Sequence, residues 1–228
     1  MNAMTKLQKG KAILMVLLVT GLDLLFGPFL LYLLKVSGVE TYSVLGASDH
    51  LPQVLLQTLV LSAYSIVLLT VFIVKYKKKF PEIFFLKVRG PVQWIWVGVL
   101  MLMLILMTGI GIQRTGDPGT ILFCLGYYVL AIGFTEEFLI RGVCVHFLRD
   151  FSWQVQYLLP SFLFAMLHVF AYNGFMPLEL HDLWRFMTSE MLGIVACGCC
   201  FQLVKERSGT LWVPILLHGI LDFSACFL

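Results

Sequence analysis

Two adjacent glutamates and an arginine lie in one apolar stretch of the sequence, TEEFLIRG at residues 135–142. On a helix, Glu137 and Arg141 are four residues apart, so they share a face and can form an ion pair. Glu136 points about 100° away from Glu137 and has no partner on its own helix. The protonation of an unpaired acid in an apolar helix is set by its surroundings, which is typical of a general base.

Three further ionisable residues lie in the apolar stretches that follow. His168 ends the run FAMLH, and His218 comes four residues before Asp222, so these two residues share a helix face. An ionisable group inside a membrane helix costs about 2.5–3.5 kcal/mol on insertion scales, and such groups are usually paired and face the protein interior. The sequence therefore predicts a polar cluster, including a general base, between apolar helices.

The composition requires that membrane helices position this cluster. Of the 228 residues, 60% are hydrophobic and 13% are charged, and the mean hydropathy is +0.92. Soluble domains have about 45–50% apolar and about 25% charged residues, so a cytosolic enzyme, a secreted domain and a disordered chain are all excluded. The net charge of +3 and the lack of a basic and aromatic stripe exclude nucleic acid as a partner.

Seven apolar segments predict an all-α integral membrane bundle of about seven transmembrane helices. They cover about residues 12–34, 52–74, 92–112, 120–148, 154–172, 188–204 and 210–228. The fourth segment is longer than a bilayer needs, so it must tilt, bend or extend into the cytosol, or a broken or re-entrant part makes eight elements. No repeat or long linker divides the chain, which predicts one membrane domain over residues 1–228.

Lysine and arginine placement predicts a multi-pass protein of the cell membrane with a cytosolic N-terminus and an external C-terminus. With this orientation the cytosolic side has 12 basic residues and the other side has 3. Counting 1.5 Å per residue from the cytosolic helix ends, Glu136 and His168 lie about 20 and 22 Å deep. His218 and Asp222 lie about 12 and 18 Å deep on the same count, so the three helices bring their polar groups to a similar layer.

The ionisable residues resemble the pattern of the CPBP family of intramembrane endopeptidases, also called the Abi or CAAX-protease-like family. The family has Glu-Glu-x-x-x-Arg on one helix, Phe-x-x-x-His on the next, and His-x-x-x-Asn or His-x-x-x-Asp near the C-terminus. Here the three motifs are Glu136-Glu137…Arg141, Phe164…His168 and His218…Asp222. The resemblance covers about residues 120–228, which we interpret as the catalytic core.

The resemblance implies that Glu136 and His168 activate a water for attack on a peptide carbonyl. It also implies that His218 and residue 222 stabilise the oxyanion, while Glu137 and Arg141 hold the site in shape. Asparagine donates a hydrogen bond through its amide, whereas Asp222 donates only when it is protonated. Two roles for Asp222 stay open: donation to the oxyanion as a protonated acid, and orientation of His218 as a carboxylate.

A zinc-dependent version of the same site is the alternative mechanism. Glu136, His168 and His218 form a His2Glu set, which resembles a catalytic zinc site with one open position. The spacing lacks a compact His-x-x-x-His pair, so the sequence favours a glutamate-type protease with no cofactor.

The resemblance implies a membrane-embedded peptide or a lipid-modified protein as substrate, with the lipid bilayer as surroundings. CAAX-like processing, maturation of bacteriocins or signal peptides, and immunity are the roles it allows. The alternative function is a non-enzymatic membrane immunity or partner protein that uses the same polar network structurally. Asp23, in the first segment, is a further acid. We interpret it as a residue at a helix-packing contact or a kink, and a role in substrate gating is the less favoured hypothesis.

Overall fold

The computed structural model describes residues 5–40, 42–172 and 179–227, and helices form nearly all of the secondary structure in them. The predicted all-α membrane class is confirmed. The α-helices are α1 (Lys6–Val36), α2 (Leu51–Leu61), α3 (Ala63–Tyr76), α4 (Phe80–Ile83), α5 (Pro91–Thr115), α6 (Pro118–Gly126), α7 (Thr135–Glu137), α8 (Val145–Leu148), α9 (Trp153–Leu167), α10 (Val169–Tyr172), α11 (Leu180–Ser189), α12 (Met191–Ser208) and α13 (Trp212–Ser224). Short 3₁₀ turns, η1 (Val44–Gly46) and η2 (Lys77–Lys79), flank α2 and α4.

The described parts of all seven predicted apolar segments are largely helical, but fewer than the predicted seven helices are able to span a bilayer. Within the described residues, three helices are long and apolar enough to cross alone: Lys6–Val36, Pro91–Thr115 and Pro118–Leu148. The pair α2 and α3 bends by 53° and the pair α11 and α12 by 52°, which gives up to five spans if each pair counts as one. Helices α9 and α13 have 15 and 13 residues. They rise by only about 22 and 20 Å, less than the bilayer core of about 30 Å.

The long fourth segment is one continuous helix from Pro118 to Leu148, so it has no break. Asp117 caps its start by accepting a hydrogen bond from the Thr120 backbone N–H at 3.0 Å. Hydrogen bonds from Thr120 hold the pKa of the Asp117 carboxyl below its ordinary value. Two π-helical stretches, η3 (Tyr127–Phe134) and η4 (Phe138–Cys144), flank the single α-helical turn α7. Such widened turns occur frequently at functional sites, and here both adjacent glutamates lie between them.

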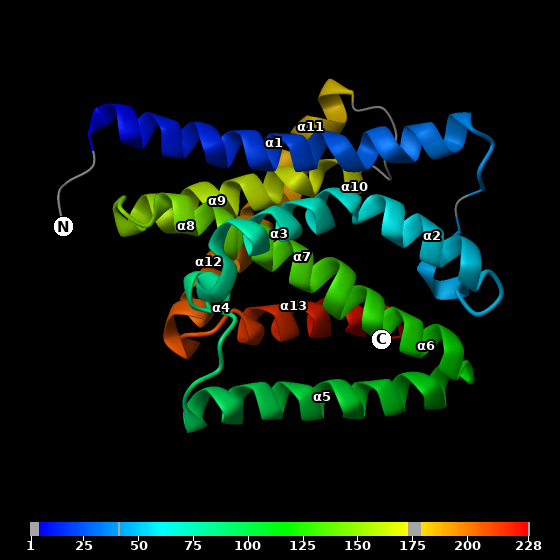
Figure 1. The fold of residues 1–228 in the computed structure, drawn as a ribbon. Coiled ribbons are helices and arrows are strands. Elements are labelled where there is room, and N and C mark those ends of the chain that lie inside the picture. Colours follow the sequence, from blue (N-terminus) through cyan, green and yellow to red (C-terminus); the bar gives the residue numbers. More distant parts are fainter. Residues whose placement is uncertain (1–4, 41, 173–178, 228) are drawn as a thin grey trace.

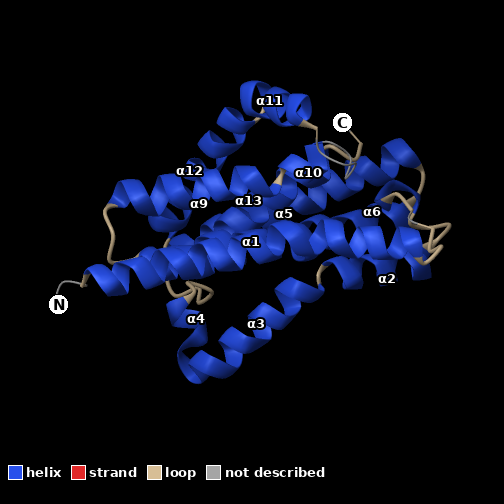
Figure 2. Cartoon of the chain, turned by 90° about the horizontal axis from the view of Figure 1, so that it is seen from above, coloured by secondary structure: helices blue, strands red, loops and turns tan. Residues whose placement is uncertain are grey.

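The helix over 118–148 crosses the middle of the molecule, and other helices pack on each side of it (Figure 1). On one side α13 lies between η3 and α5. On the other side α1 runs alongside α8 and α9, and α12 packs against α9. Seen from above, α3 and α11 extend away from this bundle in opposite directions (Figure 2).

An aromatic cluster fixes the central helix at the end of the molecule where the chain starts. Phe138 contacts Phe72, Phe80 and Phe84, with ring centroids 5.2–6.4 Å apart. The same end holds the Lys9 ammonium, 5.8 Å from the Phe151 ring centroid. The structure thus places the N-terminal end of α1, the α3–α4 turn and the α8–α9 turn together, and all three carry basic residues that the sequence assigns to the cytosol.

Candidate active site

A fully buried ion pair forms the base of the site. Glu137 and Arg141 are 0% and 1% exposed, and Glu137 Oε1 lies 3.2 Å from Arg141 Nη1. The guanidinium also donates to the Gly198 carbonyl at 3.1 Å. It lies 4.4 Å from the ring centroid of Phe164 and 5.4 Å from that of Phe201. Aromatic faces and a backbone carbonyl therefore complete the surroundings of the cation, and Glu137 is held in one position.

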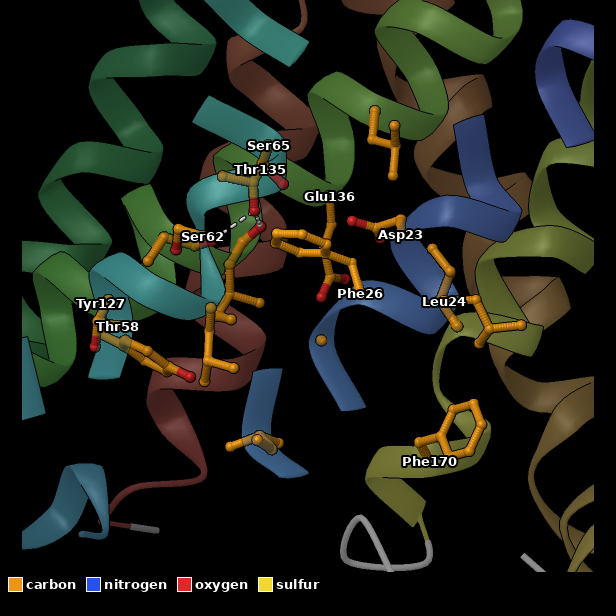
Figure 3. Close-up of a pocket in the computed structure, with 17 residues that line it drawn as sticks. Asp23, Leu24, Phe26, Thr58, Ser62, Ser65, Tyr127, Thr135, Glu136 and Phe170 are labelled. Carbon is orange, nitrogen blue, oxygen red and sulfur yellow. Dashed lines mark hydrogen bonds between the residues drawn. The ribbon is translucent and has the colours of Figure 1, made fainter. Parts of the chain in front are cut away.

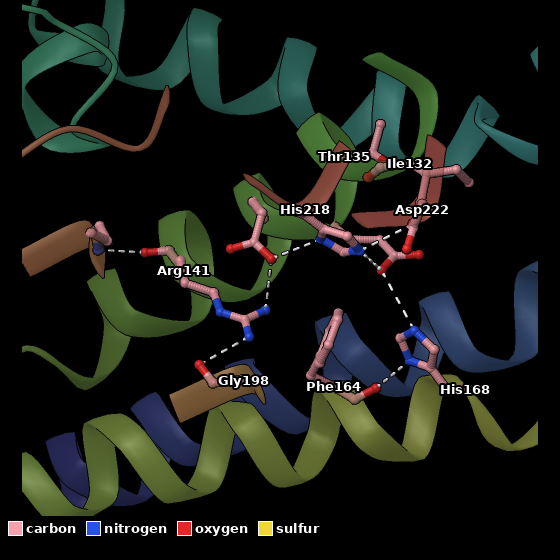
Figure 4. A network of polar contacts seen from close by, with 11 residues as sticks. Ile132, Thr135, Arg141, Phe164, His168, Gly198, His218 and Asp222 are labelled. Carbon is pink, nitrogen blue, oxygen red and sulfur yellow. Dashed lines mark hydrogen bonds and ion pairs between the residues drawn. The ribbon is translucent and has the colours of Figure 1, made fainter. Parts of the chain in front are cut away.

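His218 contacts carboxylates through both of its ring nitrogens (Figure 4). Nδ1 lies 3.0 Å from Glu137 Oε1, and Nε2 lies 3.3 Å from Asp222 Oδ2 and 3.8 Å from Glu136 Oε2. A neutral imidazole has one N–H, so both contacts can be hydrogen bonds only if the ring carries both protons or if one carboxyl is protonated and donates to the ring. The Phe201 ring stacks on His218 at 5.2 Å and fixes the plane of the imidazole.

A close approach of backbones brings α13 to this position. A Cβ atom on Gly219 would lie only 2.8 Å from Val129 Cγ2 in η3, and one on Gly133 would lie 3.0 Å from the Ile215 carbonyl oxygen. Glycine at both positions lets α13 pack directly on η3. His218, which precedes Gly219, is thereby placed beside the two glutamates.

His168 directly follows α9, which ends at Leu167, and caps the C-terminal end of that helix. Its backbone N–H bonds to the Ala165 carbonyl, and its Nδ1 lies 2.9 Å from the Phe164 carbonyl oxygen. A carbonyl can only accept, so Nδ1 carries the hydrogen and the neutral ring presents a lone pair at Nε2. That nitrogen faces Glu136 Oε2 at 4.0 Å.

Glu136 Oε2 faces the Nε2 atoms of both histidines of the site. It lies 4.0 Å from His168 Nε2 and 3.8 Å from His218 Nε2, too far for direct hydrogen bonds. This oxygen is buried and has no hydrogen-bond partner in the described part of the chain. A polar contact of this length is of the kind that a water molecule bridges. Such a water would donate one hydrogen to Glu136 and the other to the lone pair of His168.

The structure places all six ionisable residues of the sequence-derived site in one network: Glu136, Glu137, Arg141, His168, His218 and Asp222. A cavity on one side of the network is lined by His168, His218, Asp222 and Glu190. A second cavity, on the side facing α1, is lined by Glu136 and Asp23.

Sequence reasoning missed the groups that surround Arg141. Phe201 belongs to none of the motifs found in the sequence. Gly198 contributes only its backbone carbonyl, and every residue has one, so its residue type gives no signal. The only signal was the run of small residues around Gly198. A Cβ atom there would lie 2.9 Å from the Ser161 side chain and 3.0 Å from the Arg141 guanidinium, so glycine allows α12 to approach α9.

The residues of the zinc alternative do not form a ligand group as they are placed. Among the described residues, no three histidine, cysteine, aspartate or glutamate side chains gather closely enough to bind one metal ion. The Nε2 atom of His218 is directed to Asp222 and its Nδ1 to Glu137, so both nitrogens of this ring already have carboxylate partners.

Residues 118–224 match the family described as type II CAAX prenyl endopeptidase Rce1-like. The matched segment, slightly under half of the chain, is similar to the Rce1-like family. The match confirms the resemblance to CAAX-protease-like enzymes, and it supports peptidase activity in general. All six residues of the network lie within the matched segment of this Rce1-like protein, whereas Asp23 lies outside it. No curated protein and no solved structure matches the chain.

Proposed function

We propose that this Rce1-like protein hydrolyses a peptide bond of a membrane-embedded peptide or a lipid-modified protein through a water activated by Glu136 and His168. The observation that carries the proposal is the pair of acceptors, Glu136 Oε2 and His168 Nε2, which face each other at 4.0 Å. Two acceptors with no donor between them bind the two hydrogens of a water and direct its oxygen lone pairs outward. That arrangement suits attack on a carbonyl carbon.

Each residue of the network has a separate role in the proposed hydrolysis. Glu136 accepts a proton as the water oxygen adds to the carbonyl carbon, and the carbonyl oxygen becomes an oxyanion. A proton on His218 Nε2 stabilises the oxyanion, together with Asp222 when that acid is protonated. The C–N bond then breaks, and the proton on Glu136 passes to the leaving amine. Glu137 and Arg141 take no proton in this scheme, since their role is to fix His218 from behind.

The decisive test is cleavage of candidate membrane peptides by the purified protein in liposomes, with products identified by mass spectrometry. We expect cleavage by the wild type and almost none by His168→Ala, because alanine removes one of the two water-binding acceptors. A strong chelator should leave the wild-type rate nearly unchanged. Loss of activity with chelator and recovery with added zinc would contradict the metal-free mechanism. Identical behaviour of the wild type and His168→Ala on every peptide would favour the non-enzymatic partner role.

Asp222→Asn should keep or raise activity, most clearly at alkaline pH. Glu137 already orients His218 through Nδ1, at 3.0 Å, so an orienting role for Asp222 is redundant and a donating role is favoured. Asparagine donates at any pH, whereas an aspartic acid stops donating once it loses its proton. Asp222→Ala should lower kcat by about 10²-fold, as loss of an oxyanion donor does. A large loss in Asp222→Asn at every pH, with an intact fold, would leave Asp222 as an orienting carboxylate.

We propose a cytosolic N-terminus and an external C-terminus for the protein. The support is the 12-to-3 distribution of basic residues and the gathering of the basic helix ends at one end of the molecule. A reporter fused after Lys79 should register as cytosolic, and one fused to the C-terminus as external. Two reporters on the same side of the membrane would overturn this orientation.

A further inference from the structure

Asp23 lies inside the first membrane helix and outside the segment that the family match covers. The helix α1 has 31 residues, and an 18-residue stretch of it has a mean hydropathy of 2.2. It is therefore one of the most apolar parts of the chain. An acid at such a position is expensive, so it is usually retained because it faces the protein interior and interacts there. The mechanism proposed above gives Asp23 no role.

The structure places Asp23 in the cavity that Glu136 also lines. This cavity has a volume of about 200 Å³, which leaves room for several water molecules. It lies between α1, the bend of α2 and α3, and the central helix, and Thr58, Ser62 and Ser65 are among the residues that line it. Figure 3 shows Asp23 beside Glu136, with the two carboxyl groups directed into the same space.

The two acids differ in what surrounds them. Glu136 faces Nε2 of His218 at 3.8 Å, and a proton on that nitrogen favours a negative charge on this carboxyl. Behind them, Glu137 and Arg141 neutralise each other, and Asp222 contacts His218. No hydrogen bond or ion pair joins the Asp23 side chain to another described residue. The other titratable groups near Asp23 are Tyr64 of α3, Tyr127 of η3 and Cys144 of η4, none of which is a cation.

We propose that Asp23 is a positioning residue of the active site, which holds a proton opposite Glu136 and donates it as a hydrogen bond to water in the shared cavity. Two carboxylates that line one cavity between apolar helices resist ionising together, so the pair retains one proton. A proton on His218 Nε2 favours the ionised form of Glu136, and the proton of the pair therefore stays on Asp23. Glu136 remains ionised and able to accept a proton from the attacking water.

The proton on Asp23 is not transferred during hydrolysis. The proton that Glu136 takes from the water goes on to the leaving amine, and Asp23 keeps its own. Ionisation of Asp23 at alkaline pH would add a second negative charge facing the site. That charge opposes the one developing on the carbonyl oxygen, so the rate should fall. This inference rests on Glu136 being the base of the proposed function.

The first experiment needs no peptidase activity. Infrared spectra of the purified protein should show a protonated carboxyl band at neutral pH that Asp23→Asn removes and the cavity variant Ser65→Ala keeps. In Glu136→Gln the same band should disappear at a pH about one unit lower than in the wild type, because the like charge that keeps the proton on Asp23 is gone. An Asp23 band that is absent at neutral pH, or that Glu136→Gln leaves unmoved, would overturn the inference.

The second experiment measures kcat/KM against pH. Asp23→Asn keeps a hydrogen-bond donor that cannot ionise, so its rate should persist to a pH at least about one unit higher than the wild-type rate does. Asp23→Glu should restore the wild-type alkaline fall, and Ser65→Ala should superimpose on the wild type. Profiles of Asp23→Asn and wild type that coincide would leave Asp23 as a packing residue. If the wild type cleaves nothing, the proposed function fails, and the infrared result still tests the proton on Asp23.

Discussion

Glu136→Gln should lower kcat by about 10²–10⁴-fold, the range expected when a general base is removed. Glutamine keeps the size of the side chain but cannot accept the proton of the attacking water. The carboxyl oxygen Oε2 lies between two imidazole nitrogens at 4.0 and 3.8 Å, so an amide nitrogen at this position would present a donor where the proposed water needs an acceptor. The measurement is single-turnover cleavage of a membrane peptide identified with the wild type.

The matched control for this variant is Glu190→Gln. Glu190 lines the same cavity as His168 and His218, but no network contact reaches it from Glu136. Its replacement should change the rate by no more than a few-fold. Both variants should fold, since a neutral amide costs less than a charge in the membrane. Activity of Glu136→Gln close to that of the wild type would remove Glu136 from the role of base.

Arg141→Met should destabilise the protein by about 3–5 kcal/mol, which is the cost of breaking a buried ion pair by removing one partner. Glu137 is 0% exposed and relies on Arg141 for compensation of its charge at 3.2 Å. Methionine fills much of the space between Phe164 and Phe201 but leaves the buried carboxylate of Glu137 with only His218 as a polar partner. A loss of this size corresponds to a fall in Tm of about 10 °C, measurable by thermal unfolding in detergent.

Lys87→Met provides the comparison for Arg141→Met. Lys87 also pairs with a glutamate, Glu82, at 3.1 Å, but the two side chains are 54% and 37% exposed. Water screens exposed pairs, so this variant should have nearly the Tm of the wild type. The double variant Glu137→Gln with Arg141→Met removes both charges and should recover part of the lost stability. Equal Tm values for Arg141→Met and Lys87→Met would show that the buried pair does not stabilise the fold.

The membrane class and the six network residues could be predicted from the sequence because each follows from a local property. A fixed rise and rotation per residue relate Glu137 to Arg141 and His218 to Asp222 along single helices. The cost of an ionisable group in an apolar segment marked these residues without knowledge of their partners. The same cost marked Asp23, although the sequence favoured a packing role for it.

The limits of the spans and the contacts between helices were decided only by the tertiary structure. Local sequence did not reveal that α9 ends just before His168, that α13 has 13 residues, or that two π-helical stretches enclose the adjacent glutamates. These helix limits and π-helical stretches depend on the neighbouring helices that pack against them. Glycine is needed at position 219 because Val129 of another helix packs against it. The role proposed for Asp23 depends on Glu136, which lines the same cavity. Contacts between distant residues are set by the joint packing of all the helices, and no periodicity within one helix encodes them.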